Sequence, residues 1–283
     1  MTEQIGNWLQ SNGFGAINRL EPVGGGCINN TTRIHLEDGS SVFLKQQDSP
    51  PADFFTAEKT GLEALGQAGA LRVPQVIHCA TDFLLLEDLG QGTPAPNYWH
   101  VLGTGLAKLH RESKTSFGFI ADNYCGSTPQ VNTLSDDGHK FFAQYRILNL
   151  MQTAFNLGHL DSSDVRSIET LAAKLSQWIP EQAAVLIHGD LWSGNIHCDN
   201  KGNPALIDPA AYWGWAEAEL AMTLLFGGFG RDFYTSYEQA SSIARNWRER
   251  APLYNLYHLL NHLVLFGGSY LSQVRASVRQ YVK

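Results

Sequence analysis

The feature that most restricts the fold is a ten-residue stretch, LIHGDLWSGN, at residues 186–195. Its apolar start predicts a strand, and the glycine in its middle permits a tight turn directly after that strand. A second short apolar strand is expected at residues 205–208 and ends in Asp208. Because the chain returns over the turn to form this strand pair, we expect Asp190, Asn195 and Asp208 to lie close together.

The spacing of these polar residues is typical of a kinase catalytic loop. In such a loop Asp190 would accept the proton of a substrate hydroxyl, and we expect it to stay ionised outside the metal shell. Asn195 and Asp208 would hold Mg²⁺ on ATP, since Mg²⁺ prefers carboxylate and carbonyl oxygen ligands. His188 is expected to be buried and to brace the loop, without a chemical role.

A glycine-rich turn lies between the first two β-rich segments of the chain. Gly24, Gly25 and Gly26 would let the backbone approach a phosphate and present N–H groups to it. A plain flexible turn is the alternative. Cys27 follows directly, and its oxidation would impede ATP binding if the turn is a phosphate site; an incidental small residue is the alternative.

A lysine and a glutamate follow this turn in the order that a kinase nucleotide-binding lobe requires. Lys45 ends the strand expected at residues 41–45, and Glu58 lies near the start of the helix expected at residues 52–68. We interpret Lys45 as a contact to the ATP phosphates and Glu58 as its ion-pair partner. The alternative is a surface lysine at the end of a strand.

The pattern of the chain changes at Glu87, Asp88 and Leu89, which follow an almost wholly apolar strand. In a two-lobed kinase this position is the hinge, where backbone groups read the adenine edge. We therefore predict an α+β protein-kinase-like fold with an N-terminal antiparallel-sheet lobe at residues 1–87. A mainly helical lobe with the catalytic loop and the acceptor site would occupy residues 88–283.

The remaining periodicity predicts the elements of both lobes. An Asp-Gly turn at residues 38–39 predicts a hairpin between its two flanking strands. Two segments rich in aromatic residues, 115–133 and 209–217, are expected to be irregular loops. Strands are expected within 16–47 and at 73–77 and 83–88. Helices are expected at 3–12, 52–68, 98–111, 136–157, 162–178, 218–226, 231–246 and 252–281.

Composition excludes several classes of protein. The 283 residues carry a net charge of −7, so a nucleic-acid-binding surface is not expected. The N-terminus has no signal-peptide pattern and no apolar run approaches the length of a membrane span. The four cysteines are far apart in sequence, which favours reduced thiols over a disulfide or zinc framework. We therefore expect a cytoplasmic protein without membrane partners.

Several motifs together resemble the fructosamine kinase (ketosamine kinase) family, part of the aminoglycoside phosphotransferase and choline kinase group. The resemblance extends over roughly residues 24–268, and its most specific element is the LWSGN run that follows His-Gly-Asp. The motifs are GGGCIN at 24–29, FG at 117–118, DN at 122–123, GSTPQ at 126–130, Asn132, HGDLWSGN at 188–195 and DPA at 208–210.

The resemblance implies ATP-dependent phosphorylation of a sugar hydroxyl on a ketosamine, the adduct that forms when glucose or ribose glycates an amine. Such a reaction would serve the repair of glycated proteins. It also implies the roles assigned above to Asp190, Asn195, Asp208 and the pair of Lys45 and Glu58. Glu87 to Leu89 would again form the adenine hinge.

The chain departs from the family pattern after the Asp-Pro-Ala motif. Where the family commonly has Arg-Glu-x-Asp, this sequence has Ala216, Glu217 and Glu219, so the glutamate at 217 is kept. Loss of an arginine removes a bidentate donor, which bears on substrate choice more than on catalysis.

Four residues are candidates for the acceptor site: Trp192, Trp213, Trp215 and Glu217. Trp192 would be either a wall of the acceptor pocket or a core residue. Trp213 and Trp215 would either face a sugar ring or serve the core.

Two alternatives to a ketosamine kinase stay open at this stage. One is a kinase for another hydroxyl acceptor, such as an aminoglycoside or choline. The other is an ATP-binding pseudokinase, against which the presence of all three polar residues of the catalytic loop argues. The sequence leaves the physiological ketosamine and the oligomeric state open.

Overall fold

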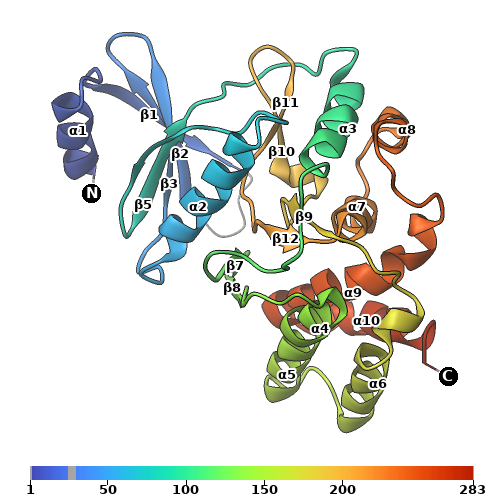
Figure 1. Ribbon diagram of the computed structural model, residues 1–283. Coiled ribbons are helices and arrows are strands. Elements are labelled where there is room, and N and C mark those ends of the chain that lie inside the picture. The colour runs from blue at the N-terminus through green and yellow to red at the C-terminus, as the bar shows by residue number, and fades with distance from the viewer. Residues whose placement is uncertain (1, 25–29, 283) are drawn as a thin grey trace.

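The structure, a computed structural model, describes residues 2–24 and 30–282. Within these residues the N-terminal lobe contains an antiparallel sheet with the strand order β1-β2-β3-β5-β4, seen on the left of Figure 1. Its strands are β1 (Ile17–Val23), β2 (Asn30–Leu36), β3 (Ser41–Gln46), β4 (Val76–Cys79) and β5 (Phe83–Glu87). Its helices are α1 (Thr2–Ser11) and α2 (Phe54–Gln67).

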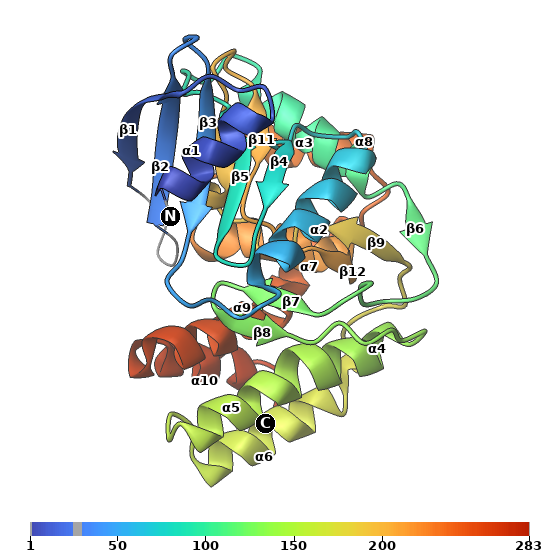
Figure 2. The same cartoon turned by 90° about the vertical axis from the view of Figure 1, so that its left-hand side faces the viewer.

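The two helices of this lobe cover opposite faces of the sheet, and Figure 2 shows α1 lying across it. Because side chains alternate along a strand, β5 divides its residues between the two faces. Phe83 and Leu85 pack with α1, whereas Leu84 and Leu86 pack with α2. Strand β5, which leads into the hinge, is therefore buried on both sides.

The second lobe is mainly helical, as we predicted. Helices α5 and α6 form the end of the molecule farthest from the sheet (Figures 1 and 2). The helices are α3 (Tyr98–Leu109), α4 (Gly138–Phe141), α5 (Asn149–Asn156), α6 (Ser162–Ala172), α7 (Ala216–Leu225), α8 (Arg231–Ala240), α9 (Trp247–Phe266) and α10 (Leu271–Arg279). The protein thus has the two-lobed α+β architecture predicted from the sequence, while the boundary between residues 87 and 88 stays a prediction.

Short strands in the second lobe position the catalytic loop. Strand β9 is the centre of a small sheet with the order β12-β9-β6, and β10 pairs with β11. A further hairpin is formed by β7 and β8. The strands are β6 (Ser113–Lys114), β7 (Asn123–Cys125), β8 (Thr128–Gln130), β9 (Ala184–Ile187), β10 (Ile196–Cys198), β11 (Pro204–Leu206) and β12 (Tyr212–Gly214).

The Asp38–Gly39 hairpin is confirmed, because β2 and β3 pair across that turn and Gly39 has a positive φ of 84°. Both segments expected to be irregular contain strands instead. Residues 115–133 include the β7–β8 hairpin, and residues 209–217 include β12, which pairs with β9. For β12 the cause is pairing with the distant strand β9, which the local pattern does not report, whereas β7 and β8 pair with each other across a short turn.

Helix boundaries differ from expectation at several places. The helices expected at 162–178 and 231–246 end at Ala172 and Ala240, and the helix expected from residue 252 begins at Trp247. The helix expected at 252–281 ends at Phe266, because Gly267 has a φ of 80°, and α10 begins at Leu271. The helix expected at 136–157 contains a π-helical segment, Phe142–Leu148, between α4 and α5. Among the helices of the described residues, none combines the length and apolar character that a membrane span requires.

Candidate active site

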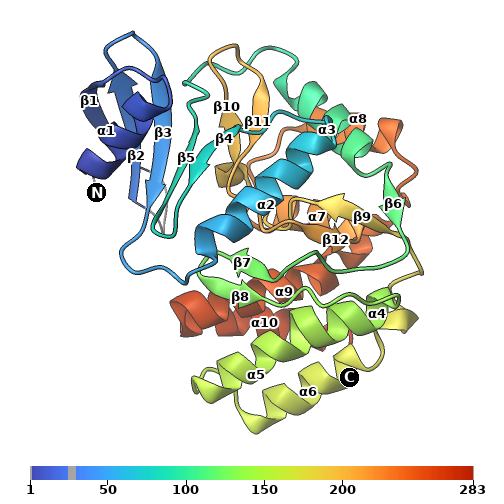
Figure 3. The ribbon, with the colours of Figure 1, turned by 60° about the vertical axis from the view of Figure 1, so that its left-hand side comes forward.

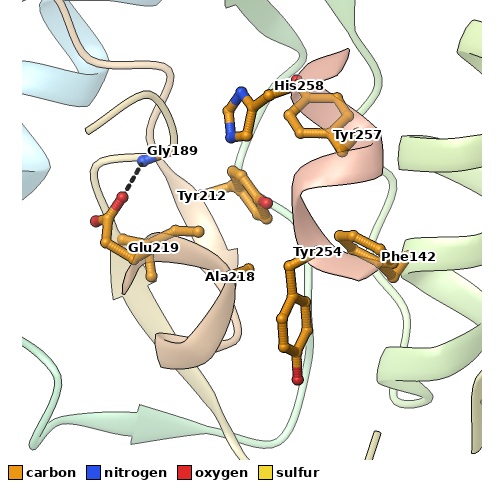
Figure 4. A pocket seen from close by; sticks show the side chains of 9 residues that line it. Phe142, Gly189, Tyr212, Ala218, Glu219, Tyr254, Tyr257 and His258 are labelled. Carbon is orange, nitrogen blue, oxygen red and sulfur yellow. Dashed lines mark hydrogen bonds between the residues drawn. The ribbon is translucent and has the colours of Figure 1, made fainter. Parts of the chain in front are cut away.

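The catalytic loop is held in place by one buried carboxylate. Glu219, in the first turn of α7 and 1% exposed, accepts hydrogen bonds from the backbone N–H groups of His188 and Gly189. Figure 4 shows the bond to Gly189. The loop therefore leaves β9 with its first two amide groups bonded to a helix of the same lobe. Sequence reasoning noted Glu219 only as a departure from a pattern and missed this role.

His188 braces the loop from the other side, as we predicted. The imidazole is fully buried and its Nε2 lies 2.8 Å from the carbonyl oxygen of Ile207, just before Asp208. Burial lowers the pKa of His188, so the ring is neutral and donates its Nε2–H to that carbonyl. This bond joins the loop to the segment that carries Asp208.

Gly189 has a steric role in this turn. Its φ is 82°, and a Cβ at this position would lie 2.1 Å from the carbonyl oxygen of Ala210. A larger residue would force the two segments apart, so the turn requires glycine.

Asp190 and Asn195 contact each other directly. The Asn195 Nδ2 lies 2.9 Å from the Asp190 carbonyl oxygen and 3.1 Å from its Oδ2. The amide nitrogen is thus used within the loop, which leaves the Asn195 carbonyl oxygen as the group suited to a cation. The backbone N–H of Ile207 donates to the main-chain carbonyl oxygen of Asn195 at 3.1 Å, which leaves the side-chain Oδ1 uninvolved, so the loop and the strand pair form one unit.

Burial raises the pKa of Asp190 to about 7; the Asn195 hydrogen bond opposes this shift, and the negative charges of Asp208 and Glu219 add to it. The expectation that Asp190 stays ionised therefore needs correction, because its charge changes near neutral pH in this structure. A pKa close to the working pH is favourable for general base catalysis.

Asp208 joins the two lobes. Its φ of 55° lies in the left-handed region, which aspartate tolerates better than most residues. The side chain is 44% exposed, and its Oδ1 lies 2.9 Å from the ammonium nitrogen of Lys45 on β3. A carboxylate beside Asn195 that is open to the cleft matches the all-oxygen donor set that Mg²⁺ prefers.

Lys45 is buried and bonded to two carboxylates. Besides Asp208, its ammonium group lies 2.5 Å from Oε1 of Glu58 on α2. Burial disfavours the charged ammonium, but Asp208 and Glu58 outweigh it and raise the pKa of Lys45 above its ordinary value. The structure therefore brings together the lysine and glutamate that we selected from sequence.

Glu87, Asp88 and Leu89 line the cleft where β5 ends. The side chain of Asp88 accepts hydrogen bonds from Arg33, Ser41 and the backbone N–H of Gly90. Glu87 instead forms an ion pair with Arg72 at 2.6 Å. Two backbone groups are used internally: the N–H of Glu87 bonds to Gln75, and the carbonyl of Leu89 bonds to Asn200.

The polar side chains proposed for catalysis, metal binding and phosphate contact line one cleft between the lobes, with a volume of about 660 Å³, together with the residues at the end of β5. Gly24 lies on its wall. Gly25, Gly26 and Cys27 lie outside the described residues. The rest of the predicted phosphate turn and the proposed redox sensitivity of Cys27 therefore stay predictions.

The four acceptor-site candidates separate into one residue on the cleft and three elsewhere. Trp192 lines the cleft, and its ring packs edge-on against Phe226 with centroids 6.3 Å apart. Trp213 lies on β12, under the ammonium group of Lys114. Trp215 is 3% exposed among core aromatic side chains, Phe117 included.

Glu217 is likewise structural. It is 1% exposed and forms a bidentate ion pair with Arg250, while Tyr254 donates a third hydrogen bond to it. The substrate roles expected for Trp213, Trp215 and Glu217 are therefore corrected: these side chains pack within the helical lobe and do not line the cleft. Ala216, which stands where the family commonly has an arginine, does not line the cleft either.

The wall of the cleft that the helical lobe forms has an aromatic rim that sequence reasoning missed. Phe226 is 40% exposed and Phe266 is 54% exposed, both on the cleft wall with Tyr270 and His262. The available signal was the end of two apolar helices, which gives no indication of which face is left uncovered. Directly beneath the catalytic loop, His258 projects from α9 toward it (Figure 4).

Comparison with known proteins gives consistent matches over the whole chain. A sequence model described as fructosamine kinase matches residues 1–283. A probable ketoamine kinase of Synechocystis sp. is 36% identical over 94% of this chain and 91% of its own length. A chloroplastic protein-ribulosamine 3-kinase of Arabidopsis thaliana is 34% identical over 99% of this chain and 88% of its own length.

Solved structures agree with these sequence matches. The crystal structure of a candidate fructosamine-3-kinase from Thermobifida fusca has 32% identity and a TM-score of 0.86, and the match covers 94% of this chain and 93% of that one. An aminoglycoside phosphotransferase in its ADP-bound form has 15% identity and a TM-score of 0.63, covering 98% of this chain and 95% of that one. The latter likeness concerns the fold, which is protein-kinase-like.

Proposed function

From the premise that the chain belongs to the fructosamine kinase family, we propose that it transfers the γ-phosphoryl group of ATP to a sugar hydroxyl of a ketosamine. One observation supports this proposal above all others. Asp190, Asn195, Asp208 and Lys45 come from both lobes and line a single cleft. Phosphoryl transfer needs little more from a protein than this positioning and charge neutralisation.

The nucleotide would lie between the hinge and the lysine. The backbone N–H of Leu89 has no hydrogen-bond acceptor among the described residues, and it would read the adenine edge. Lys45 would contact the phosphates. Asn195, through its carbonyl oxygen, and Asp208 would hold Mg²⁺, which when bound neutralises charge on the transferring phosphoryl group.

Asp190 would act on the acceptor. Its carboxylate would accept the proton of the sugar hydroxyl as the oxygen forms a bond to the γ-phosphorus. The bond between that phosphorus and the β–γ bridging oxygen breaks, which leaves ADP and a phosphorylated ketosamine. The bond from Asn195 Nδ2 keeps the Asp190 carboxylate oriented, and Glu219 and His188 keep the whole loop in place.

The proposed acceptor class rests on the names of the relatives. Relatives are named as ketoamine and protein-ribulosamine kinases, so fructosamines and ribulosamines are the compounds that we propose, with repair of glycated amines as the role. Trp192 and the aromatic rim would contact the sugar face and the amine substituent, since aromatic rings pack well against apolar sugar faces. A cytoplasmic location is part of the proposal, and cell fractionation tests it.

A ³¹P-detected reaction tests the proposal. The protein, ATP and Mg²⁺ would be incubated separately with fructosyl-lysine, ribulosyl-lysine, an aminoglycoside and choline. We expect a new phosphomonoester signal with the ketosamines and none with the other acceptors. Phosphorylation of the aminoglycoside or choline in preference to both ketosamines would contradict the proposed acceptor class but keep the kinase chemistry. Hydrolysis of ATP without any phosphorylated acceptor would contradict the proposal as a whole.

A further inference from the structure

Three metal-ligating side chains meet beside the proposed catalytic base. They are Cys125 at the end of β7, Asp190 in the catalytic loop and His258 on α9, and one donor atom of each lies within 4.8 Å of the other two. Neither the cysteine nor the histidine has a part in the phosphoryl transfer described above. Both are buried, with exposed fractions of 2% and 5%.

His258 supplies an independent sign that this cluster binds something. Its Nδ1 is buried and has no hydrogen-bond partner among the described residues, which is costly for a polar group in a protein core. The nearest carboxylate oxygen, Oδ1 of Asp190, lies 3.9 Å away. That distance is too long for a hydrogen bond. Figure 4 shows the imidazole projecting from α9 toward the loop that contains Gly189.

The donor set and its spacing suit a borderline divalent cation. One sulfur, one imidazole nitrogen and one carboxylate oxygen are ligands that Zn²⁺ accepts together. Tetrahedral zinc with bonds of about 2.0–2.3 Å sets neighbouring donor atoms roughly 3.3–3.7 Å apart. The Asp190–His258 distance of 3.9 Å is close to that value and the other donor pairs are no more than 4.8 Å apart, so the side chains would have to move closer together around an ion.

Charge and outer contacts also favour a cation here. A Cys125 thiolate and the Asp190 carboxylate together balance a doubly charged ion, and binding would release the thiol proton to solvent. Asn261 Nδ2 lies 3.3 Å from the Cys125 sulfur and would orient the thiolate from outside the coordination sphere. Cys125, Asp190 and Asn261 all border the cleft, which gives an ion an entry path.

We propose that Cys125, Asp190 and His258 form a site for Zn²⁺ or a similar ion, and that its occupation inhibits the kinase. A metal bound to the Asp190 carboxylate would occupy the oxygen that otherwise accepts the acceptor proton. The site differs in chemistry from the all-oxygen pair of Asn195 and Asp208, so Mg²⁺ would not fill it. Metal binding stands by itself, whereas the inhibition rests on the proposed function of Asp190.

Binding is tested first without nucleotide, because ATP itself chelates zinc. The unmodified protein, with reduced thiols, would be titrated with Co²⁺ as a spectroscopic probe and then with Zn²⁺. We expect one ion to produce a thiolate-to-cobalt charge-transfer band, and Zn²⁺ to displace it. The variants Cys125→Ser and His258→Gln should bind Zn²⁺ more than about tenfold more weakly. Cys79→Ser, which changes a thiol in the other lobe, is the matched control and should bind as the parent does.

Inhibition is tested next, with Mg–ATP and a ketosamine at buffered free Zn²⁺ concentrations. We expect the parent and Cys79→Ser to lose activity reversibly, with recovery on addition of a chelator, and the two site variants to resist at least tenfold higher free Zn²⁺. Zinc binding without inhibition would contradict the role of Asp190 in the inference.

Three further outcomes would overturn the site itself. The first is the absence of a thiolate–cobalt band in the unmodified protein, a measurement that needs no variant to fold. The second is parental zinc affinity in both Cys125→Ser and His258→Gln. A zinc affinity that falls in His258→Gln but not in Cys125→Ser would also overturn the site, because the cysteine sulfur would then not be a ligand. If the cobalt band forms but no acceptor is phosphorylated, the proposed kinase function is contradicted and the proposed metal site is supported.

Discussion

The catalytic loop at residues 188–195 and the aromatic segment at residues 210–219 are close in sequence but differ in use. In the loop Asp190 and Asn195 line the cleft, and Trp192 lines it with them. In the aromatic segment Trp215 and Glu217 are 3% and 1% exposed and stabilise the lobe. Similar residue types thus serve the site in one segment and the core in the other, because β12 is drawn into pairing with β9.

The largest expected effect concerns the base of the catalytic loop. Asp190→Asn removes the proton acceptor and keeps the side-chain shape, so turnover should fall by roughly 10²–10⁴-fold. The affinity for ATP should stay within about twofold, since the lysine and the hinge are unchanged. Steady-state kinetics and nucleotide titration measure both quantities. Asp232→Asn, an exposed change on α8, is the control, and equal turnover of the two variants would refute the assignment of the base.

The two tryptophans give the sharpest test of the comparison. Trp215→Ala should lower the free energy of unfolding by about 3–5 kcal/mol, because it opens a cavity in a buried aromatic cluster. Trp192→Ala should cost far less stability and should instead raise the KM for the ketosamine. Urea unfolding and kinetics on both variants separate the two effects. A stability loss of equal size in both would mean that the two segments do not differ as described.

Glu219 links the aromatic segment to the loop, so its replacement should disturb both. Glu219→Ala leaves the amide groups of His188 and Gly189 without their acceptor, at a cost of about 1–3 kcal/mol for each buried group. Glu219→Gln keeps an acceptor oxygen and should cost less in stability and in kcat. If alanine and glutamine behave alike in denaturant unfolding and in turnover, the carboxylate does not hold the loop.

The smallest effect is expected at the surface of the aromatic segment. The ammonium group of Lys114 lies 4.1 Å from the centroid of the Trp213 ring, a cation–π contact. Lys114→Ala should lower stability by about 0.5–1 kcal/mol, and Lys114→Arg should retain it. Neither change should alter the KM for the acceptor, because Trp213 lies off the cleft. A changed KM for the acceptor with unchanged stability would indicate that Trp213 contributes to acceptor binding.

Part of the fold and much of the site could be predicted, because the sequence signals for them are local. The Asp38–Gly39 turn, the lysine at the end of a strand and the spacing from Asp190 to Asn195 depend on a few consecutive residues. Backbone geometry and turn chemistry act over such distances, so pattern alone identifies them.

The features that sequence reasoning missed depend on contacts between distant segments. His258 and Glu219 look like ordinary helix residues, and only the packing of α9 and α7 beneath the loop reveals what they face. The same is true of β12, which takes its conformation from its partner strand. The apolar residues of α7 show no clear helical period in the sequence. The sequence therefore does not distinguish a residue that holds the loop from one that fills the core.

Strand β5 lies between α1 and α2 and leads directly into the hinge. Its amide hydrogens should therefore be among the slowest in the protein to exchange with solvent, because their release requires opening of the sheet lobe. Flexibility between the lobes then has to arise after the strand, near Gly90, whose φ is 67°. Helix α2 lies on the side of the sheet that faces the helical lobe (Figure 3), and its Gly61 packs closely on Pro209. This contact opposes free movement, so lobe closure should be a small rotation about the protected strand.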